Sequence, residues 1–358
     1  MNESAAPLIL VINPGSTSTK VALFNGANRG AGESLSHSKE ELARFQTNWE
    51  QYDYRLDLII QFLNRQNLKA FALTAVVGRG GLLKPLRRGT YKIGANMIED
   101  ARRGVQGDHI SNLGCALAHE IARLYSCASY VVDPVSVDEF EPLARYSGHP
   151  RIERKALSHA LNLRATAIWG AEAMGLDPFT TNLIVAHLGG GISIAPLRGS
   201  RIIDVNDASS DGPFSPERSG GLPLQPFIDL CFSGEYSKTE MKQFVMGRGG
   251  LAAYLGTKDA QEVESRIENG DAKAAEVYQA MAYQIAKEIA AMASVLNGQV
   301  HGIMITGGLA HSRHLIDWIK ERVAFIAPVR IFAGELEMEA MAAGVLRVLS
   351  GQENACDY

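Results

Sequence analysis

Residues 183–223 constrain the fold of this chain more than any other stretch. An apolar, β-branched run at 183–186 is interrupted by three consecutive glycines at 189–191, and a second apolar run follows at 192–197. Glycines without Cβ let the backbone turn sharply and bring its N–H groups close to a bound anion. The pattern predicts a strand, an anion-binding loop and a second strand. A hairpin whose glycines only relieve crowding is the alternative.

One other segment repeats this order, and a third loop follows another predicted strand. Near the N-terminus, the apolar residues 8–13 are followed by a hydroxyl-rich loop at 14–20 and a second apolar run at 21–24. Towards the C-terminus, residues 302–305 lead into Thr306-Gly307-Gly308 and then into a predicted helix. Three elements of this kind predict an α/β protein with partly parallel sheets, in which two related domains bind a nucleotide through its phosphates.

Composition and charge narrow the function. The chain has 358 residues, enough for two domains that each have a full core. A net charge of −4 argues against nucleic-acid and anionic-membrane partners. The four cysteines form no C-x-x-C pair, so we expect free thiols in a reducing compartment. Residues 1–7 lack the basic segment of a secretory signal, and no apolar run is long enough to cross a bilayer. We therefore expect a cytoplasmic protein.

The same pattern of elements predicts where the domains lie. Residues 1–165 are expected to form the first domain, completed by a C-terminal helix within residues 335–358. Residues 166–334 are expected to form the second, nucleotide-binding domain. A helical pattern at 155–174 is expected to carry the chain from one domain to the other. The longest predicted helix, at 271–297, is expected to form the core of the second domain.

Charged residues at predicted strand ends are candidates for phosphoryl chemistry, which needs cations and metal-holding carboxylates. Asp133 ends a predicted strand and precedes a proline, which favours an extended backbone. It is a candidate Mg²⁺ ligand, and a turn or cap residue is the alternative. Arg79 lies between glycines at another strand end, and Arg218 lies in the long loop after the central hairpin. Either could clamp a carboxylate or a phosphate; a solvated surface arginine is the alternative.

Histidines and further acids extend this set. Three histidines could donate to a bound ligand, although a single histidine is more often a cap or a core residue: His109, His159 and His187. Three acids open the last predicted helix, where they suit the helix dipole, and metal contact by one of them is the alternative: Glu335, Glu337 and Glu339.

Several common catalytic motifs are missing from the sequence. It contains no G-x-x-x-x-G-K-[ST] loop, no protein-kinase H-R-D and D-F-G pair, no strand followed by G-x-G-x-x-G and no G-x-S-x-G. Phosphoryl transfer on a duplicated scaffold is compatible with these absences.

Four motifs together resemble the acetokinase family. They are VINPGSTSTK at 11–20, AHLGGG at 186–191, ERSG at 217–220 and TGG at 306–308. Within this family, GRGG at 78–81, DPV at 133–135 and GELE at 334–337 look most like the butyrate kinase group. The likeness runs in order from about residue 8 to residue 349.

The resemblance implies a fold and a reaction. The implied fold has two ribonuclease-H-like domains, of the actin and acetate kinase type, with a cleft between them. The implied cofactors are ATP and Mg²⁺, and the implied acceptor is a short-chain fatty acid such as butyrate, which yields an acyl phosphate and ADP reversibly. It also implies a homo-oligomer. Other short-chain acids, a sugar-kinase-like phosphotransferase and a non-catalytic nucleotide switch are the alternatives.

The resemblance also implies roles for matching residues. On the nucleotide side these are Asn13, Ser16, Ser18, Lys20, His187, Gly189, Gly190, Gly191, Gly307 and Gly308. On the catalytic side these are Arg79, His109, Asp133, Lys155 and Arg218. The metal is expected at Asn13, Asp133 and Glu335, with Glu337 as the alternative to Glu335.

Two positions depart from the family pattern. Val76 stands where acetate kinases have an arginine, so the available arginine is Arg79, three residues later. Lys155 stands where they have a histidine that stabilises the transition state, while the later His159 is kept. Either Lys155 takes over that histidine's donor role or another group does.

The implied acceptor simplifies the chemistry. A carboxylic acid titrates at about pH 4, so at neutral pH it is already ionised and needs no general base. Catalysis is then expected to rest on in-line positioning and on stabilisation of charge in the transition state.

Overall fold

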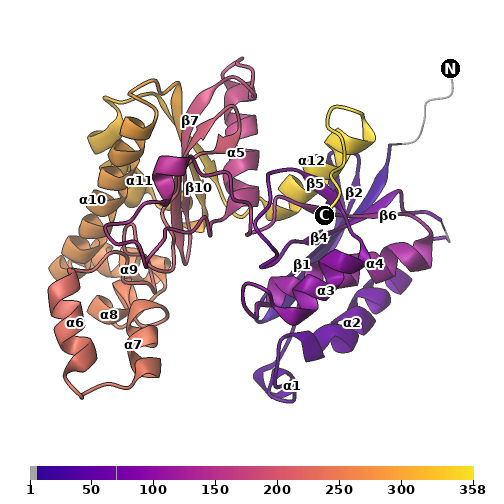
Figure 1. Cartoon of the computed structure of the whole chain (residues 1–358), viewed down its shortest axis with the longest axis horizontal. Helices are drawn as coiled ribbons and strands as arrows, with labels where there is room; N and C mark the ends of the chain where they lie inside the picture. The colour runs from indigo at the N-terminus through magenta and orange to yellow at the C-terminus, as the bar shows by residue number, and fades with distance from the viewer. Residues whose placement is uncertain (1–5, 70) are drawn as a thin grey trace. The chain divides into compact units, whose positions relative to one another are not determined.

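The computed structural model describes residues 6–69 and 71–358, so residues 1–5 of the N-terminal segment considered for a signal lie outside it. The chain divides into two compact units (Figure 1). Unit 1 comprises the chain up to Asp138 together with Leu336–Tyr358, and unit 2 comprises Glu139–Glu335.

Unit 1 is built on a mixed sheet whose strand order is β3-β2-β1-β4-β6-β5. Strands β1, β4 and β6 are parallel neighbours, whereas β2, β3 and β5 each run antiparallel to the strand they join. The strands are β1 (Leu8–Pro14), β2 (Ser18–Asn25), β3 (Asn28–Ser36), β4 (Ala75–Arg79), β5 (Thr90–Lys92) and β6 (Ala128–Val132).

Helices cover both faces of this sheet. Helix α4 packs on β1, β4 and β6, and α12 packs on the same three strands and on β5. In Figure 1, α2, α3 and α4 lie on one side of the sheet and α12 lies on the other. The helices are α1 (Lys39–Leu42), α2 (Tyr52–Arg65), α3 (Ala95–Arg103), α4 (Leu113–Tyr125) and α12 (Glu337–Leu349), with the 3₁₀ turns η1 (Trp49–Gln51) and η2 (Ile110–Asn112). C-terminal α12 thus completes unit 1.

Unit 2 repeats the arrangement. Its sheet has the order β11-β10-β7-β8-β9, in which β7, β10 and β11 are parallel neighbours and β8 and β9 are antiparallel to the strands they join. This order matches β6-β4-β1-β2-β3 of unit 1 strand for strand, so the central hairpin and the N-terminal hairpin occupy equivalent places. The strands are β7 (Asn182–Leu188), β8 (Ile192–Arg198), β9 (Arg201–Ile202), β10 (Gly302–Gly307) and β11 (Val329–Ala333).

The helices of unit 2 enclose its core. Helix α10 is the longest of the described helices, and its side chains Tyr278, Met281 and Ile285 are fully buried, which confirms its predicted core role. The helices are α5 (Ala160–Ala173), α6 (Leu224–Phe232), α7 (Lys238–Val245), α8 (Gly250–Leu255), α9 (Ala260–Glu268), α10 (Ala272–Val295) and α11 (Arg313–Val323), with the 3₁₀ turns η3 (Pro142–Arg145) and η4 (Gly308–His311).

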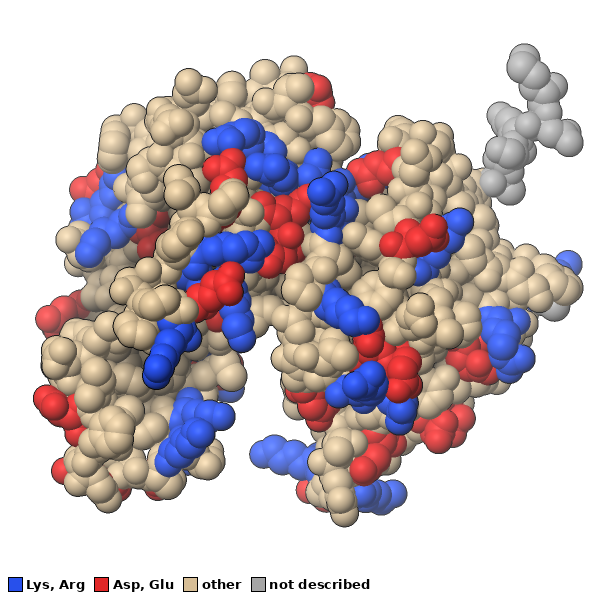
Figure 2. Space-filling model, in the orientation of Figure 1, with Lys and Arg blue, Asp and Glu red and all other residues tan. Residues whose placement is uncertain are grey.

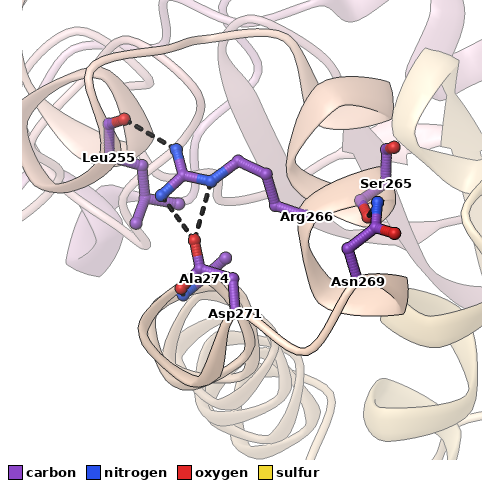
Figure 3. Close-up of polar contacts among 6 residues, drawn as sticks. All are labelled: Leu255, Ser265, Arg266, Asn269, Asp271 and Ala274. Atoms are coloured by element: carbon purple, nitrogen blue, oxygen red, sulfur yellow. Dashed lines mark hydrogen bonds and ion pairs between the residues drawn. The ribbon is translucent and has the colours of Figure 1, made fainter.

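The corner between α9 and α10 shows how α10 begins (Figure 3). Asp271 caps the helix, because its Oδ1 accepts a hydrogen bond from the Ala274 N–H at 3.0 Å. Its Oδ2 accepts from Arg266, whose Nη1 also donates to the Leu255 carbonyl at 2.9 Å. The Ala274 hydrogen bond and the Arg266 guanidinium lower the pKa of Asp271.

The two compact units divide between Asp138 and Glu139, whereas the sequence predicts a domain border at residue 165. The chain after Asp138 binds to the β9 region: the Glu141 N–H donates to the Ile203 carbonyl, and Arg154 pairs with Asp204 at 2.8 Å. Helix α5 packs on β7, β8, β9 and β10, so it covers the unit 2 sheet and does not carry the chain between the units.

Two further expectations concern the whole chain. The four cysteines are free, as predicted. Among the described residues, no helix combines the length and the apolar character needed to span a membrane.

Candidate active site

Asn13, Arg79 and Asp133 gather at one edge of the unit 1 sheet. They lie at or just beyond the ends of β1, β4 and β6, which are adjacent and parallel, so their carboxyl ends share that edge. Ligands of open α/β sheets bind beyond the carboxyl ends of the strands. The edge is therefore a candidate half-site.

The β1–β2 hairpin supplies the hydroxyl groups of this half-site. Its loop is tight, because the Gly15 N–H donates to the Ser18 carbonyl at 2.7 Å. Ser16 is exposed at the tip, and Lys20 lies directly opposite Asn13 in the strand register. The predicted phosphate-contacting residues thus belong to one short element.

Asp133 has a left-handed backbone with φ +37°, so the expectation of an extended backbone before Pro134 is wrong. Two hydrogen bonds to Gly89 hold this conformation: the Asp133 N–H donates to the Gly89 carbonyl at 3.0 Å, and Asp133 Oδ1 accepts from the Gly89 N–H at 2.7 Å. A non-glycine residue with positive φ is strained, and such strain clusters at functional sites. Asp133 combines a structural contact with a position suited to a ligand.

The acids at the start of α12 have separate contacts. Glu337 Oε1 lies 3.6 Å from Arg79 Nη1, and both side chains are largely buried. Glu339 pairs instead with Arg29 at 3.0 Å. Glu335 belongs to unit 2 and follows Gly334, whose N–H donates to the Gly307 carbonyl. Glu337, the alternative weighed above, therefore lies beside a predicted catalytic residue.

His109 is an exposed N-cap of η2. Its Nδ1 accepts a hydrogen bond from the Ser111 N–H at 3.2 Å and lies 2.7 Å from Ser111 Oγ. An accepting Nδ1 places the ring proton on Nε2 in the neutral tautomer.

In unit 2, two glycine loops meet at the equivalent sheet edge. The loop Gly189–Gly191 joins β7 to β8, and Gly307 ends β10, the parallel neighbour of β7. A Cβ on Gly307 would lie 2.2 Å from the Leu188 carbonyl oxygen, and its φ is +94°. Only glycine therefore lets the two loops approach so closely, which brings His187, Gly189, Gly190, Gly191 and Gly307 together.

Arg218 lies across the glycine loop of β7 and β8. A Cβ on Gly191 would be 2.5 Å from Arg218 Nη1, the atom that donates to the Ala208 carbonyl at 3.0 Å. The Nε atom of Arg218 is buried without a hydrogen-bond partner. Burial lowers the pKa of this guanidinium, against the opposing effect of Glu217 and Asp207. The arrangement is that of a partly buried cation next to a glycine loop, rather than a solvated surface arginine.

Two histidines stack beneath that loop. The rings of His159 and His187 are 4.1 Å apart at an interplanar angle of 21°. His187 Nδ1 lies 3.1 Å from Asn162 Oδ1, and His159 Nδ1 lies 2.9 Å from Ser193 Oγ. A Cβ on Gly189 would lie 3.1 Å from His187 Nε2, so this nitrogen faces the loop.

Lys155 is exposed in the segment before α5. The described contacts do not join it to the histidine pair, so its donor role stays a prediction. The face shown in Figure 2 carries acidic and basic side chains interspersed.

Some neighbours of the site could not be identified from the sequence alone. Asn162 orients His187, Ser215 Oγ donates to the Gly190 carbonyl at 2.6 Å, and Gly89 holds Asp133. Each is remote in sequence from its partner and belongs to no motif. Asn162 alone gives a weak signal, since it lies one helical turn after His159.

Comparison with known proteins places this chain in a family. The acetokinase family model matches residues 168–326. A protein of Caldanaerobacter subterraneus subsp. tengcongensis named probable butyrate kinase 2 is 50% identical over 350 residues, which are 98% of this chain and 99% of that protein. The chain belongs to the acetokinase family.

Other relatives agree with this assignment. Butyrate kinase 2 of Clostridium acetobutylicum is 47% identical over 98% of this chain and 99% of its own length. The crystal structure of Porphyromonas gingivalis acetate kinase superposes with a TM-score of 0.79 at 18% identity, covering 96% of this chain and all of that one. The expected α/β fold of two related units, of the acetate kinase type, is thereby confirmed for this acetokinase-family chain.

Proposed function

We propose that this acetokinase-family chain is a butyrate kinase, which transfers the γ-phosphoryl group of ATP to the carboxylate of butyrate and releases butyryl phosphate and ADP, reversibly. The observation that carries the proposal is full-length identity of about half to relatives with that name. The two half-sites support it, because each supplies cations or backbone donors at the carboxyl edge of a sheet.

Roles follow from the contacts of each half-site. In unit 2, the Gly189–Gly191 loop and Gly307-Gly308 would bind the nucleotide, and Arg218 would stabilise the equatorial oxygens of the transferring group. In unit 1, Arg79 would hold the incoming carboxylate and the β1–β2 hairpin would contact the phosphates.

The donor set at the unit 1 edge fits Mg²⁺. The Asp133 carboxylate and the Asn13 amide oxygen are hard oxygen ligands at the ends of β6 and β1, the two strands that flank β4. The described residues contain no group of three or more His, Cys, Asp or Glu side chains that could hold a metal ion. That suits Mg²⁺, which in kinases is held by one or two carboxylates and by the phosphates. When bound, it would neutralise charge on the phosphates. The third protein ligand would be Glu335 or Glu337.

His109 of unit 1 and Lys155 of unit 2 would act as hydrogen-bond donors. The Nε2–H of His109 and the exposed ammonium of Lys155 can each donate a hydrogen bond to a phosphate oxygen. Neither has to remove a proton from the acceptor, because the fatty acid is ionised at neutral pH.

We also propose that the chain is a cytoplasmic homo-oligomer. Its four thiols are free, as in a reducing compartment. Unit 2 has a cavity of about 650 Å³ lined by apolar side chains of α6, α7, α8 and α10. Next to it Leu224, Ile228 and Phe232 of α6 are 72%, 46% and 86% exposed. Such a surface suits a second copy of the chain better than solvent.

ADP release against a panel of acids tests the function. The purified chain, given ATP and Mg²⁺, should release ADP faster with butyrate than with acetate, propionate or isobutyrate. One methylene changes binding by only ~1–3 kcal/mol, so neighbouring acids should also react. A preference for another acid would make the chain a different short-chain fatty-acid kinase. Release that depends on a sugar, or on no acid, would contradict the proposal.

A further inference from the structure

Arg55 of α2 is the largest fully buried side chain among the described residues, with 0% of its surface exposed. Its Nη1 donates to Thr19 Oγ1 at 2.7 Å and to the Ser18 carbonyl at 3.3 Å. Its Nε and Nη2 both donate to Gln51 Oε1, at 3.0 and 2.8 Å. The guanidinium is thus fixed behind the β1–β2 hairpin.

The contacts of Arg55 reach the part of the hairpin that would contact phosphate. The Ser18 carbonyl that it binds also accepts from the Gly15 N–H and closes the loop. Alternation along β2 puts Thr19 on the side of α2, and puts Ser18 and Lys20 on the opposite side. Arg55 therefore supports these side chains from the far side of the strand.

No carboxylate among the described residues forms an ion pair with Arg55; its partners are a neutral amide, a hydroxyl and a carbonyl. The neighbouring imidazole does not compensate the charge. His37 Nε2 lies 2.9 Å from Thr19 Oγ1, and burial, aided by Arg55, lowers the pKa of His37 to about 4. Burial also lowers the pKa of Arg55, to about 10, which leaves it charged at neutral pH. A buried charge without a counter-ion is unfavourable.

We propose that Arg55 is a positioning residue for the phosphates of the nucleotide: it holds the hairpin loop from behind and supplies a positive charge that bound phosphate offsets. The inference rests on the proposed function, since it requires the hairpin to contact ATP. It predicts that Arg55 favours nucleotides in proportion to their phosphate charge.

Three substitutions separate charge from shape. R55M removes the charge and keeps an unbranched side chain, R55K keeps the charge and loses the planar fork, and R65M is the matched control. Arg65 lies on the same helix, but it is exposed and pairs with Glu33 at the surface. Dissociation constants for AMP, ADP and ATP are measured by calorimetry, together with the unfolding midpoint without nucleotide and the KM values for ATP and butyrate.

We expect R55M to weaken ATP binding about tenfold, ADP binding less and AMP binding least, because Coulomb attraction scales with ligand charge. In R55M, the KM for ATP should rise while the KM for butyrate stays unchanged. R55K should retain the preference for ATP over AMP, and R65M should match the unaltered chain. Without nucleotide, the unfolding midpoint of R55M should change little, because the variant removes a buried unpaired charge but leaves Gln51 Oε1 without its two donors.

Equal weakening of all three nucleotides in R55M, or a loss in R55K as large as in R55M, would overturn the proposal in favour of a purely structural role. If R55M does not fold, R55Q carries the same prediction, and failure of both to fold also overturns it. ATP binding without butyrate-dependent ADP release would refute the proposed function while leaving the Arg55 comparison decisive. Absence of ATP binding to the unaltered chain would refute both.

Discussion

At the scale of single residues, Arg218 bears most directly on the chemistry. R218A should lower kcat by about 10²–10³-fold, the effect of losing one preorganised donor to a developing charge. Steady-state kinetics measure this, with R313A as control, because Arg313 is 93% exposed in the same unit. The unfolding midpoint should change little in either variant. A near-normal kcat in R218A would show that Arg218 does not act on the transferring group.

The metal-side acid is a second question at this scale. Because Glu337 contacts Arg79 at the unit 1 edge, E337Q should raise the Mg²⁺ concentration for half-maximal rate by about tenfold or more. E335Q should leave it within about twofold, as should E339Q, whose partner is Arg29. Titration of the rate with Mg²⁺ distinguishes the three. A large shift in E335Q alone would instead support Glu335, the acid that the family resemblance implies, as the residue on the metal side.

At the scale of elements, the polar cluster of Thr19, His37 and Arg55 behind the β1–β2 hairpin predicts a dependence of stability on pH. His37 has a folded pKa of about 4, below its unfolded value of 6.5, so the unfolded state binds more protons between these pH values. Its contribution to stability is present above pH 6.5 and is lost as pH falls towards 4. Unfolding midpoints of H37Q should therefore decline less over this range than those of the unaltered chain.

The control for this experiment is H119Q, which removes an exposed histidine of α4 in the same unit. It should decline as steeply as the unaltered chain. An identical decline in H37Q would show that His37 binds its proton equally well in the folded and unfolded states.

Elements with strong local patterns could be predicted from the sequence. Both hairpins, α10 and the glycine loops follow from apolar runs and glycines that are adjacent in the chain. Contacts between elements that are distant in the sequence could not be predicted. Gly78 and Gly114 bring β4 against α4 so closely that a Cβ on Gly78 would lie 2.0 Å from the Gly114 carbonyl oxygen. Nothing local marks this pair, and the same holds for the contacts of Arg55 with Ser18 and Thr19 of β2.

At the scale of the whole molecule, the repeated strand order explains why two equivalent sheet edges, each proposed to contact phosphate, occur in one chain. The repeat was visible in the sequence because its hairpins kept their spacing. The border between the units was not visible in the sequence. Residues 139–165 contact the rest of unit 2 through the polar residues Glu141 and Arg154, and such contacts leave no hydrophobic pattern.

The exposed face of α6 gives a prediction at this scale. F232D should lower the molar mass of the particle measured by light scattering after gel filtration, because a charge would be buried in the contact between copies. F325D is the control, since Phe325 is 82% exposed in unit 2, after α11. An unaltered chain that is already monomeric, or an F232D variant of unchanged mass, would exclude α6 as the interface.

Capture of the product tests the central claim most directly. The chain is incubated with ATP, Mg²⁺ and butyrate in the presence of hydroxylamine, which converts an acyl phosphate into a hydroxamate. We predict butyryl hydroxamate in an amount equal to the ADP released, with neither formed when butyrate is left out. ADP release without hydroxamate would mean that the phosphoryl group goes to water or to a hydroxyl acceptor, and would contradict direct transfer to the carboxylate.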